Sequence, residues 1–287
     1  MLAIFKKELK SYFTSMIGYV FIAFFLIIIG LYFIVYNLVN QYANFEYVLS
    51  SISFIFVLLV PILTMRLMAE EKKQKTDQLL FTSPLPISHI IFGKFLAVFT
   101  VFLIVIGIIS LYPLILLQFG LVPLKVAYSA IFGFALLGGA YIAIGLYISS
   151  LTESQIVAAV VSFVTILITA LMDGIVTLFP KDHKSVFLIF SAIIILISII
   201  TYLMMHNLTI TLSIAVVSEI ALTIIYFVKP TLFDGLLVKV FGWFSVIERF
   251  NNFVLGLLDL SSVIYYLSVI FLFNFLTVQV IKKSRWS

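Results

Sequence analysis

The stretch MAEEKKQKTDQLLFTSPLP (residues 68–86) decides how this chain is organised, because it is polar and the sequence on both sides of it is apolar. Its charged side chains are Glu70, Glu71, Lys72, Lys73, Lys75 and Asp77. A charge in the hydrocarbon core of a membrane costs about 2.5–3.5 kcal/mol even on insertion scales. The stretch must therefore lie in water or at a membrane surface.

Helical spacing predicts a short amphipathic helix within this stretch. Glu71 precedes Lys75 by four residues, which is the favourable order for an ion pair on a helix. Residues 79–81 give an apolar end, and Pro84 and Pro86 stop the helix. We interpret the stretch as a helix held at the membrane face and tethered at both ends to membrane spans. A solvated charged loop is the alternative.

The composition indicates an all-α polytopic membrane protein. Of the 287 residues, 64% are hydrophobic and 10% are charged, whereas soluble domains have about 25% charged residues. The mean hydropathy is +1.28. There is no cysteine, which excludes disulfides and thiol chemistry. We expect the lipid bilayer, and no nucleic acid, as the surroundings of this chain.

Hydropathy predicts about eight transmembrane helices. The expected spans are residues 16–38, 47–67, 90–118, 126–150, 156–178, 186–204, 208–228 and 262–281. An even number of spans places both termini on one side, together with most of the lysines and arginines. The positive-inside rule then predicts a multi-pass protein of the plasma (inner) membrane with both termini in the cytoplasm.

Two further segments complete the single transmembrane domain that we expect over residues 1–287. Residues 1–15 read as an amphipathic interfacial helix, with Leu9 and Tyr12 on the apolar face and Glu8 on the polar face. The fourth span is rich in glycine, which permits close helix packing. Residues 231–259 combine an apolar stripe with charges, which indicates outer re-entrant or amphipathic helices; surface helices without a special role are the alternative.

The chain shows no catalytic motif. It lacks the G-x-x-x-x-G-K-[ST] loop for nucleotides and the H-E-x-x-H metal motif, and its three histidines lie far apart. We therefore expect no catalytic, cofactor-binding or metal-binding residue. Glu219 and Asp173 lie within spans, which makes them intramembrane polar candidates. For Glu219 a tolerated, protonated carboxyl is the alternative, and Asp173 can reach interfacial water.

The central segment and the carboxyl-terminal end resemble ABC-2-type permeases, the membrane subunits of type V ABC exporters. The resemblance is closest to the group of the gliding-motility permease GldF. The matching residues around the charged stretch are Pro61, Thr64, Met65, Arg66, Ala69, Glu70, Glu71, Lys72, Lys73, Thr76, Leu79, Leu80, Pro84, Gly93 and Lys94. Near the end they include Gly256, Leu258, Asp259, Leu260, Arg285 and Trp286.

The chain departs from that family in three respects. Lys75 stands where the family usually has glycine, and Gln78 where it usually has glutamate. Such permeases usually have about six spans, so residues 186–228 look like an inserted extra helix pair.

The resemblance implies that residues 68–86 form a coupling helix seated in a separate cytoplasmic ABC ATPase. The residues that would contact the ATPase are Glu70, Glu71, Lys72, Lys73, Thr76, Asp77, Leu79 and Leu80. It further implies two copies of the ATPase, which hold ATP and Mg²⁺, and a second permease copy that is identical or related. An auxiliary membrane subunit is a further possible partner. The implied function is a permease subunit, of an exporter rather than an importer.

Two other functions remain open on sequence alone. A non-transporting membrane scaffold that transmits force would use the same coupling helix. An ion-coupled secondary transporter would use Glu219 and Asp173, but it predicts internal repeats with interrupted spans, and the sequence shows no repeat.

Overall fold

The computed structural model describes residues 1–76 and 85–286, and every regular element in those ranges is helical. Eight helices in this part of the chain are long and apolar enough to cross a membrane, which confirms the expected fold class. They are Ile17–Val39, Glu46–Lys73, Ile87–Leu116, Leu124–Leu151, Gln155–Thr177, His183–Leu203, Thr211–Val228 and Leu260–Lys283.

The chain forms two compact units. The first comprises Met1–Ala170 and Val246–Ser287, and the second comprises Leu171–Ser245. Helix α10 (Gln155–Thr177) begins in the first unit and ends in the second. Each unit has its own apolar cluster.

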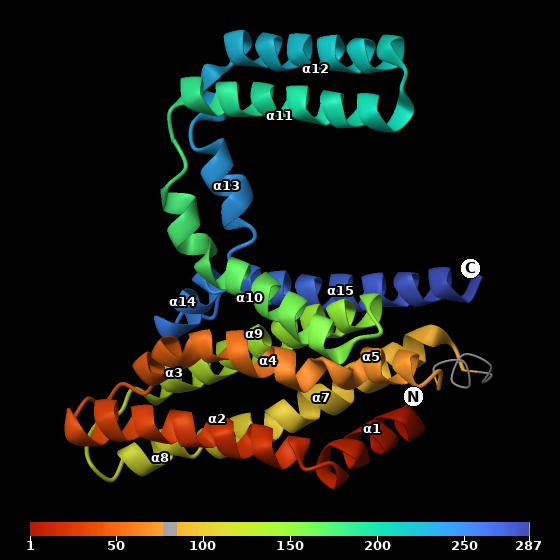
Figure 1. Ribbon diagram of the computed structural model, residues 1–287. Coiled ribbons are helices and arrows are strands. Elements are labelled where there is room, and N and C mark those ends of the chain that lie inside the picture. The colour runs from red at the N-terminus through yellow and green to blue at the C-terminus, as the bar shows by residue number, and fades with distance from the viewer. Residues whose placement is uncertain (77–84, 287) are drawn as a thin grey trace. The chain divides into compact units, whose positions relative to one another are not determined.

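Helix α9 (Leu124–Leu151) is the centre of the first unit. It is the most buried of the eight long helices and packs against the helices around it in Figure 1. These neighbours are α3 (Glu46–Ile52), α4 (Phe56–Thr64), α5 (Arg66–Lys73), α7 (Ile87–Ile109), α14 (Glu248–Val254) and α15 (Leu260–Trp286).

Glycine allows this close packing, as the sequence predicted. A Cβ atom on Gly145 would lie 2.2 Å from Oγ1 of Thr64 on α4. A Cβ atom on Gly133 would lie 2.5 Å from the ring of Phe253 on α14. Small residues at these crossings let the helix backbones approach, which is how helices gain van der Waals contact in membranes.

Aromatic rings fill the space between these helices. Phe25 of α2 (Ile17–Phe33), Phe56, Phe102 and Phe134 are fully buried. Their ring centroids lie 4.7–6.2 Å apart, in tilted or edge-on arrangements that aromatic pairs prefer. This cluster fixes α2, α4, α7 and α9 to one another.

The second long helix differs from its expected boundary. It runs through α3, a 3₁₀ turn (Ser53–Ile55), α4 and α5, and ends at Lys73. Lys75 then adopts a left-handed backbone conformation with φ of 57°. Residues 68–73, the first part of the charged stretch, therefore belong to the same long helix as the second span. The favourable Glu71–Lys75 pairing does not form, because Glu71 pairs with residues of other helices.

The amino-terminal segment forms α1 (Leu2–Thr14), a separate helix that packs on α7 and α2. The left-handed conformation of Met16, with φ of 61°, separates α1 from the first long helix. A distinct amphipathic helix is therefore present over residues 1–15, and its position at a membrane interface stays a prediction.

The second unit contains a helical hairpin of α11 (His183–Met205) and α12 (Leu208–Val228) (Figure 1). A 3₁₀ turn (Pro230–Phe233) and α13 (Leu236–Gly242) follow. The core of this unit is small, with Val186, Phe233 and Leu237 at its centre. Only 11% and 6% of the apolar stretches of α11 and α12 are buried in the protein, so lipid or another protein must cover them.

The segment of residues 231–259 forms short helices. Its first half belongs to the second unit, and α14 belongs to the first unit, where Phe250 and Phe253 are fully buried against the bundle. Short helices are therefore present. Their amphipathic or re-entrant position at the outer side, and the assignment of residues 186–228 as an insertion, stay predictions.

Candidate functional site

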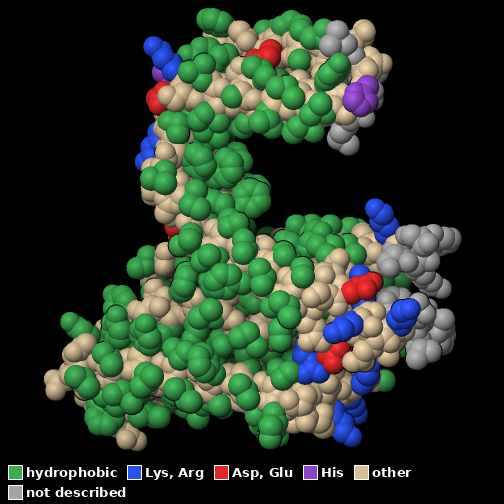
Figure 2. Space-filling view, in the orientation of Figure 1, with side chains coloured by type: hydrophobic (Ala, Val, Ile, Leu, Met, Phe, Trp, Pro, Cys, Tyr) green, Lys and Arg blue, Asp and Glu red, His purple; other side chains and the backbone are tan. Residues whose placement is uncertain are grey.

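Charged side chains gather at one end of the first unit. Figure 2 shows blue and red side chains together there, on an otherwise apolar bundle. A cleft of about 250 Å³ opens between α1, α5 and the first turns of α7. The residues that line it are Lys7, Glu8, Ser11, Tyr12, Ser15, Arg66, Leu67, Glu70, Glu71, Gln74, Thr76 and Lys94.

Lys94 of α7 is a buried lysine that lines this cleft. Only 1% of its side chain is exposed. Its Nζ lies 3.0 Å from Glu8 Oε1, 2.9 Å from Glu71 Oε2 and 2.9 Å from the carbonyl oxygen of Leu67. Nζ donates hydrogen bonds to Glu8 Oε1 and to the Leu67 carbonyl, and Glu71 Oε2 adds an ion pair without a hydrogen bond of good geometry. A buried charge is tolerated only when it is paired in this way, so Lys94 ties α1, α5 and α7 together.

Glu8 was expected on the polar face of α1, and that expectation was wrong. Glu8 is 9% exposed and lies on the buried face with Ile4 and Tyr12, one helical turn apart. The reason is the charge of Lys94, which a carboxylate can neutralise only from inside the contact between α1 and α7. The pattern of α1 alone carries no sign of that partner.

Tyr12 extends the contact between α1 and the second long helix. Its hydroxyl donates a hydrogen bond of 2.7 Å to the carbonyl oxygen of Leu63. Burial, followed by the negative charge of Glu8, raises the pKa of Tyr12 well above its usual range. The phenol therefore stays protonated and keeps its hydrogen bond at every ordinary pH.

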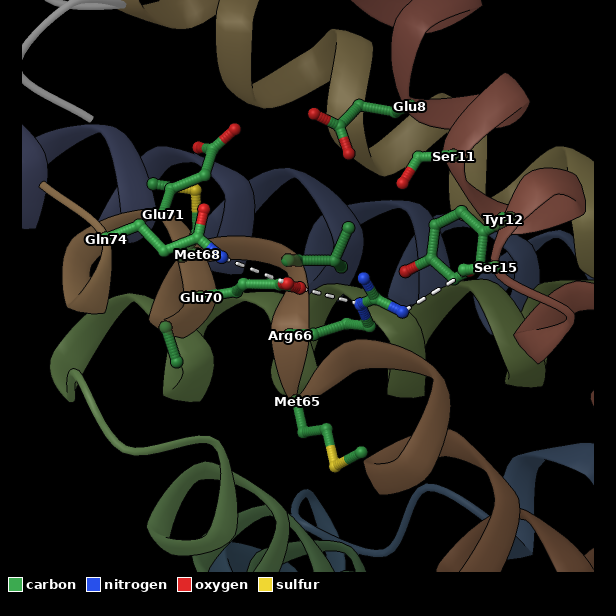
Figure 3. A network of polar contacts seen from close by, with 12 residues as sticks. Glu8, Ser11, Tyr12, Ser15, Met65, Arg66, Met68, Glu70, Glu71 and Gln74 are labelled. Atoms are coloured by element: carbon green, nitrogen blue, oxygen red, sulfur yellow. Dashed lines mark hydrogen bonds and ion pairs between the residues drawn. The ribbon is translucent and has the colours of Figure 1, made fainter. Parts of the chain in front are cut away.

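Arg66 closes the other wall of the cleft (Figure 3). Its Nε lies 2.8 Å from Glu70 Oε2, and its guanidinium donates to Ser15 Oγ at 3.3 Å. Gln74 Nε2 donates to the second oxygen of Glu70 at 3.4 Å. Arg66 therefore connects the second long helix to the residue that follows α1.

Ser149 of α9 enters the backbone of the second long helix where α4 meets α5. Its hydroxyl donates to the carbonyl oxygen of Met65 at 2.9 Å and accepts from the backbone N–H groups of Met68 and Ala69 at 3.1 and 3.2 Å. In a regular helix the Ala69 N–H would bond the Met65 carbonyl. A hydroxyl inserted into such a ladder produces a bend, and here it comes from a neighbouring span.

The predicted ATPase-contact residues divide into internal and exposed groups. Glu70 and Glu71 bind within the cleft, and Lys72 Nζ donates to the carbonyl oxygen of Ser150 at 2.6 Å. Lys73 is exposed, and Thr76 is half-buried with its hydroxyl 3.4 Å from the carbonyl oxygen of Glu71. The remaining predicted contacts lie outside the described residues; they are Asp77, Leu79 and Leu80.

The two intramembrane candidates lie in the second unit, and each has a hydroxyl partner. The Ser191 hydroxyl on α11 donates to Glu219 Oε1 on α12 at 2.9 Å, and the Ser245 hydroxyl donates to Asp173 Oδ1. Within the described part of the chain, each of the two carboxyls is bonded to a different serine, and no contact joins them. Over the same residues, no three His, Asp or Glu side chains are grouped as metal ligands would be.

These features define a class: a multi-pass membrane protein with a charged, ion-paired cleft at one end of its helical bundle. A family model described as "ABC-2 family transporter protein" matches residues 37–232, which is more than half of the chain. The chain therefore belongs to that family and is a permease subunit of an ABC transporter. Members of the family are normally non-catalytic membrane components that generally work with a cytoplasmic ABC ATPase. A comparison with curated proteins found no match.

Proposed function

We propose that this chain is the permease subunit of an ATP-driven exporter, and that the charged end of its first unit receives the movement of a separate cytoplasmic ATPase. The observation that carries the proposal is the burial of Lys94 between Glu8 and Glu71. It fastens two surface elements, α1 and the end of α5, to a long apolar helix. A docking surface that transmits force needs such an attachment.

The route of the force follows from the contacts. A push on the exposed end of α5 reaches α7 through Lys94 and reaches α9 through Ser149 and Lys72. Ion pairs with little solvent contact are screened less than surface pairs, so they resist separation. Movement of the ATPase would thus displace two central spans together with α1.

The proposed contact surface consists of the exposed residues at the end of α5 and directly after it, before residue 77. Lys73 and Lys75 are exposed, while Glu70, Glu71, Lys72 and Gln74 have partners within the chain. We expect the first group to meet the ATPase directly and the second group to position it. The roles first predicted for Glu70, Glu71 and Lys72 are therefore refined, from contact to positioning.

The remaining parts of the proposal rest on the family and on the charge distribution. We propose two ATPase copies that hold ATP and Mg²⁺, and a second permease, identical or related, as in the GldF-like group. The lysines and arginines near both termini support a location in the inner membrane with both termini in the cytoplasm. The chain itself would supply no catalytic residue.

Co-purification tests this function. The tagged chain is expressed with its genomic neighbours and purified in mild detergent, and we expect an ATPase with a phosphate-binding G-x-x-x-x-G-K-[ST] loop in the eluate. The double variant Lys73→Glu with Lys75→Glu should lose it. Lys125→Glu is the matched control, because Lys125 is exposed at the start of α9, the end of that helix opposite Ser149. If no ATPase co-purifies, or if both variants retain it equally, the proposed contact surface is wrong.

A further inference from the structure

A second cleft lies at the opposite end of the first unit from Lys94. Its volume is about 630 Å³, within the usual range of small-molecule sites of about 300–1,000 Å³. It is lined by Asn37 and Leu38 of a π-helical turn (Ile34–Val39), by the loop that follows, and by Leu116, Phe119 and Gly120. The first long helix runs from Ile17, next to the charged cleft, to Val39 at this one.

Asn37 brings a buried, unused acceptor to this cleft. The residue is 4% exposed, and its Nδ2 donates to the carbonyl oxygen of Tyr42 at 2.6 Å. That bond fixes the orientation of the amide, and Oδ1 then has no hydrogen-bond partner among the described residues. A buried polar atom without a partner is rare in native proteins and needs an explanation, such as an absent ligand.

The backbone around Asn37 is held in unusual conformations. The helix changes to π geometry at Ile34–Val39, and Gln41 has a positive φ of 58°. Such turns cluster at functional sites, because the extra residue re-aims side chains and the strain must be offset elsewhere. Here they place the Asn37 amide at the cleft.

A carboxylate close in sequence indicates the charge of the ligand. Glu46, three residues beyond the cleft-lining Ala43, is 3% exposed. Its Oε1 accepts from Asn44 Nδ2 at 2.5 Å, and Oε2 has no hydrogen-bond partner within the described part of the chain. The unused atom that belongs to a lining residue is an acceptor, and the segment that lines the cleft continues into a buried acid with a second unused oxygen. A cationic hydrogen-bond donor satisfies both requirements.

The surroundings indicate a lipid rather than a water-soluble amine. Leu38 and Phe119, which line the cleft, are 42% and 72% exposed and join the apolar outer surface of the bundle. Tyrosines gather at the same end of the helices, where Tyr32 and Tyr36 stack with a centroid distance of 6.1 Å. Tyrosine is enriched where a membrane protein meets the lipid headgroups.

We propose that this cleft binds the headgroup of a phospholipid whose ammonium group carries N–H donors, with phosphatidylethanolamine as the prototype. The ammonium donates to Asn37 Oδ1, and the acyl chains lie against Leu38 and Phe119. The site is distinct from the charged cleft and does not depend on an ATPase.

Headgroup methylation gives a direct test, because each methyl group removes one N–H while the positive charge remains. The purified protein is titrated with phosphatidylethanolamine, its N-methyl and N,N-dimethyl forms and phosphatidylcholine, all with the same acyl chains, and lipid adducts are quantified by native mass spectrometry. We expect affinity to fall along the series, by about tenfold or more between the first and the last. Equal binding of all four lipids overturns the proposal.

Variants then locate the site. Asn37→Leu should abolish the preference for N–H donors. Asn274→Leu is the matched control, because Asn274 is fully buried in α15 with an unused Oδ1 and lines none of the clefts described here. Leu38→Trp changes a partly exposed residue of the cleft wall and should weaken the binding of all four lipids. This variant replaces Asn37→Leu in the test if Asn37→Leu does not fold. A preference that survives in Asn37→Leu, unchanged affinities in Leu38→Trp, or competition by free phosphoethanolamine as strong as by the lipid refutes a lipid site at this cleft.

Discussion

Nζ of Lys94 lies 2.9 Å from Oε2 of Glu71, and this ion pair joins the start of one span to the end of another. The lysine is 1% exposed and the glutamate side chain 13% exposed, so the pair is largely shielded from water. Neither residue belongs to a catalytic constellation. In the function proposed above this contact is mechanical, because it would make the helices that it joins move together.

Removing the charge of Lys94 should destabilise the first unit strongly. Lys94→Met removes the buried cation and leaves Glu8 and Glu71 with only the exposed Lys7, whose Nζ lies 3.8 and 3.4 Å from them. Breaking a buried ion pair on one side costs about 3–5 kcal/mol. Thermal unfolding in detergent measures the loss. Lys184→Met, at an exposed position, is the control and should change stability by less than about 0.5 kcal/mol. Indistinguishable unfolding of the two variants would show that the ion pair carries no stability.

Removing the Ser149 hydroxyl should loosen the junction of α4 and α5. Ser149→Ala loses three hydrogen bonds at a fully buried position and leaves the Met65, Met68 and Ala69 backbone groups to re-pair among themselves. We expect a loss of about 1–3 kcal/mol in the free energy of unfolding. Ser213→Ala is the control, because Ser213 is exposed and bonds only within its own helix, to Thr209. Faster amide hydrogen exchange at residues 65–69 in the Ser149 variant alone would support the assignment.

A methyl group at Gly145 should force α4 and α9 apart. Its Cβ would lie 2.2 Å from Thr64 Oγ1, and overpacking of this kind costs about 1–3 kcal/mol. Gly107→Ala is the matched control, since a Cβ there meets nothing within 4 Å. The control should be neutral or stabilising by up to about 1 kcal/mol, because alanine favours helix over glycine. A melting temperature for Gly145→Ala equal to or above that of Gly107→Ala would rule out the close crossing.

The buried phenol of Tyr12 should make stability sensitive to alkaline pH. Its folded-state pKa is raised, so its contribution is fully present below the unfolded pKa of about 10 and is lost as the pH rises above that value. Tyr12→Phe cannot ionise, so the fall in stability between about pH 10 and 11 should be shallower in this variant. The measurement is the free energy of unfolding against pH for both proteins. Parallel curves would mean that Tyr12 is already exposed to solvent.

Replacing the carboxyl of Glu219 should leave function intact if the chain acts as an ATP-driven permease. Glu219→Gln keeps an oxygen that can accept from Ser191, so the hairpin of α11 and α12 should persist. In cells that lack the chromosomal copy, this variant should restore the wild-type phenotype, and Lys73→Glu with Lys75→Glu should not. The reverse result would favour ion-coupled transport through Glu219.

Local sequence was sufficient for the long helices. All eight expected spans appear; seven agree with their predicted ends to within about three residues, and the second continues to Lys73. The glycines at 133 and 145 lie at close helix crossings. The spans follow from the transfer free energy of an apolar window, which is a sum along the chain. The close crossings follow from the absence of a Cβ atom in glycine, which is a property of one residue.

The sequence predicts only part of the candidate site. The charged stretch lies at the end of the bundle where the cleft forms, but the periodicity of α1 predicts the wrong face for Glu8, and Lys94 stands out only within the family pattern. No feature of the sequence marks the unused acceptor of Asn37. A single buried charge changes no periodicity, so the sequence contains no local signal of which partner will neutralise it.

The sequence by itself therefore determined that the chain crosses the membrane about eight times, and that residues 68–86 cannot stay in hydrocarbon. The tertiary structure alone decided that Glu8 and Glu71 meet at Lys94, that the Ser149 hydroxyl enters the backbone between Met65 and Ala69, and that Asn37 lines a cleft at the far end. The physical reason is that solvation acts on each segment separately. The partner of a buried polar atom, in contrast, is set by distances of about 3 Å between residues that are far apart in the chain.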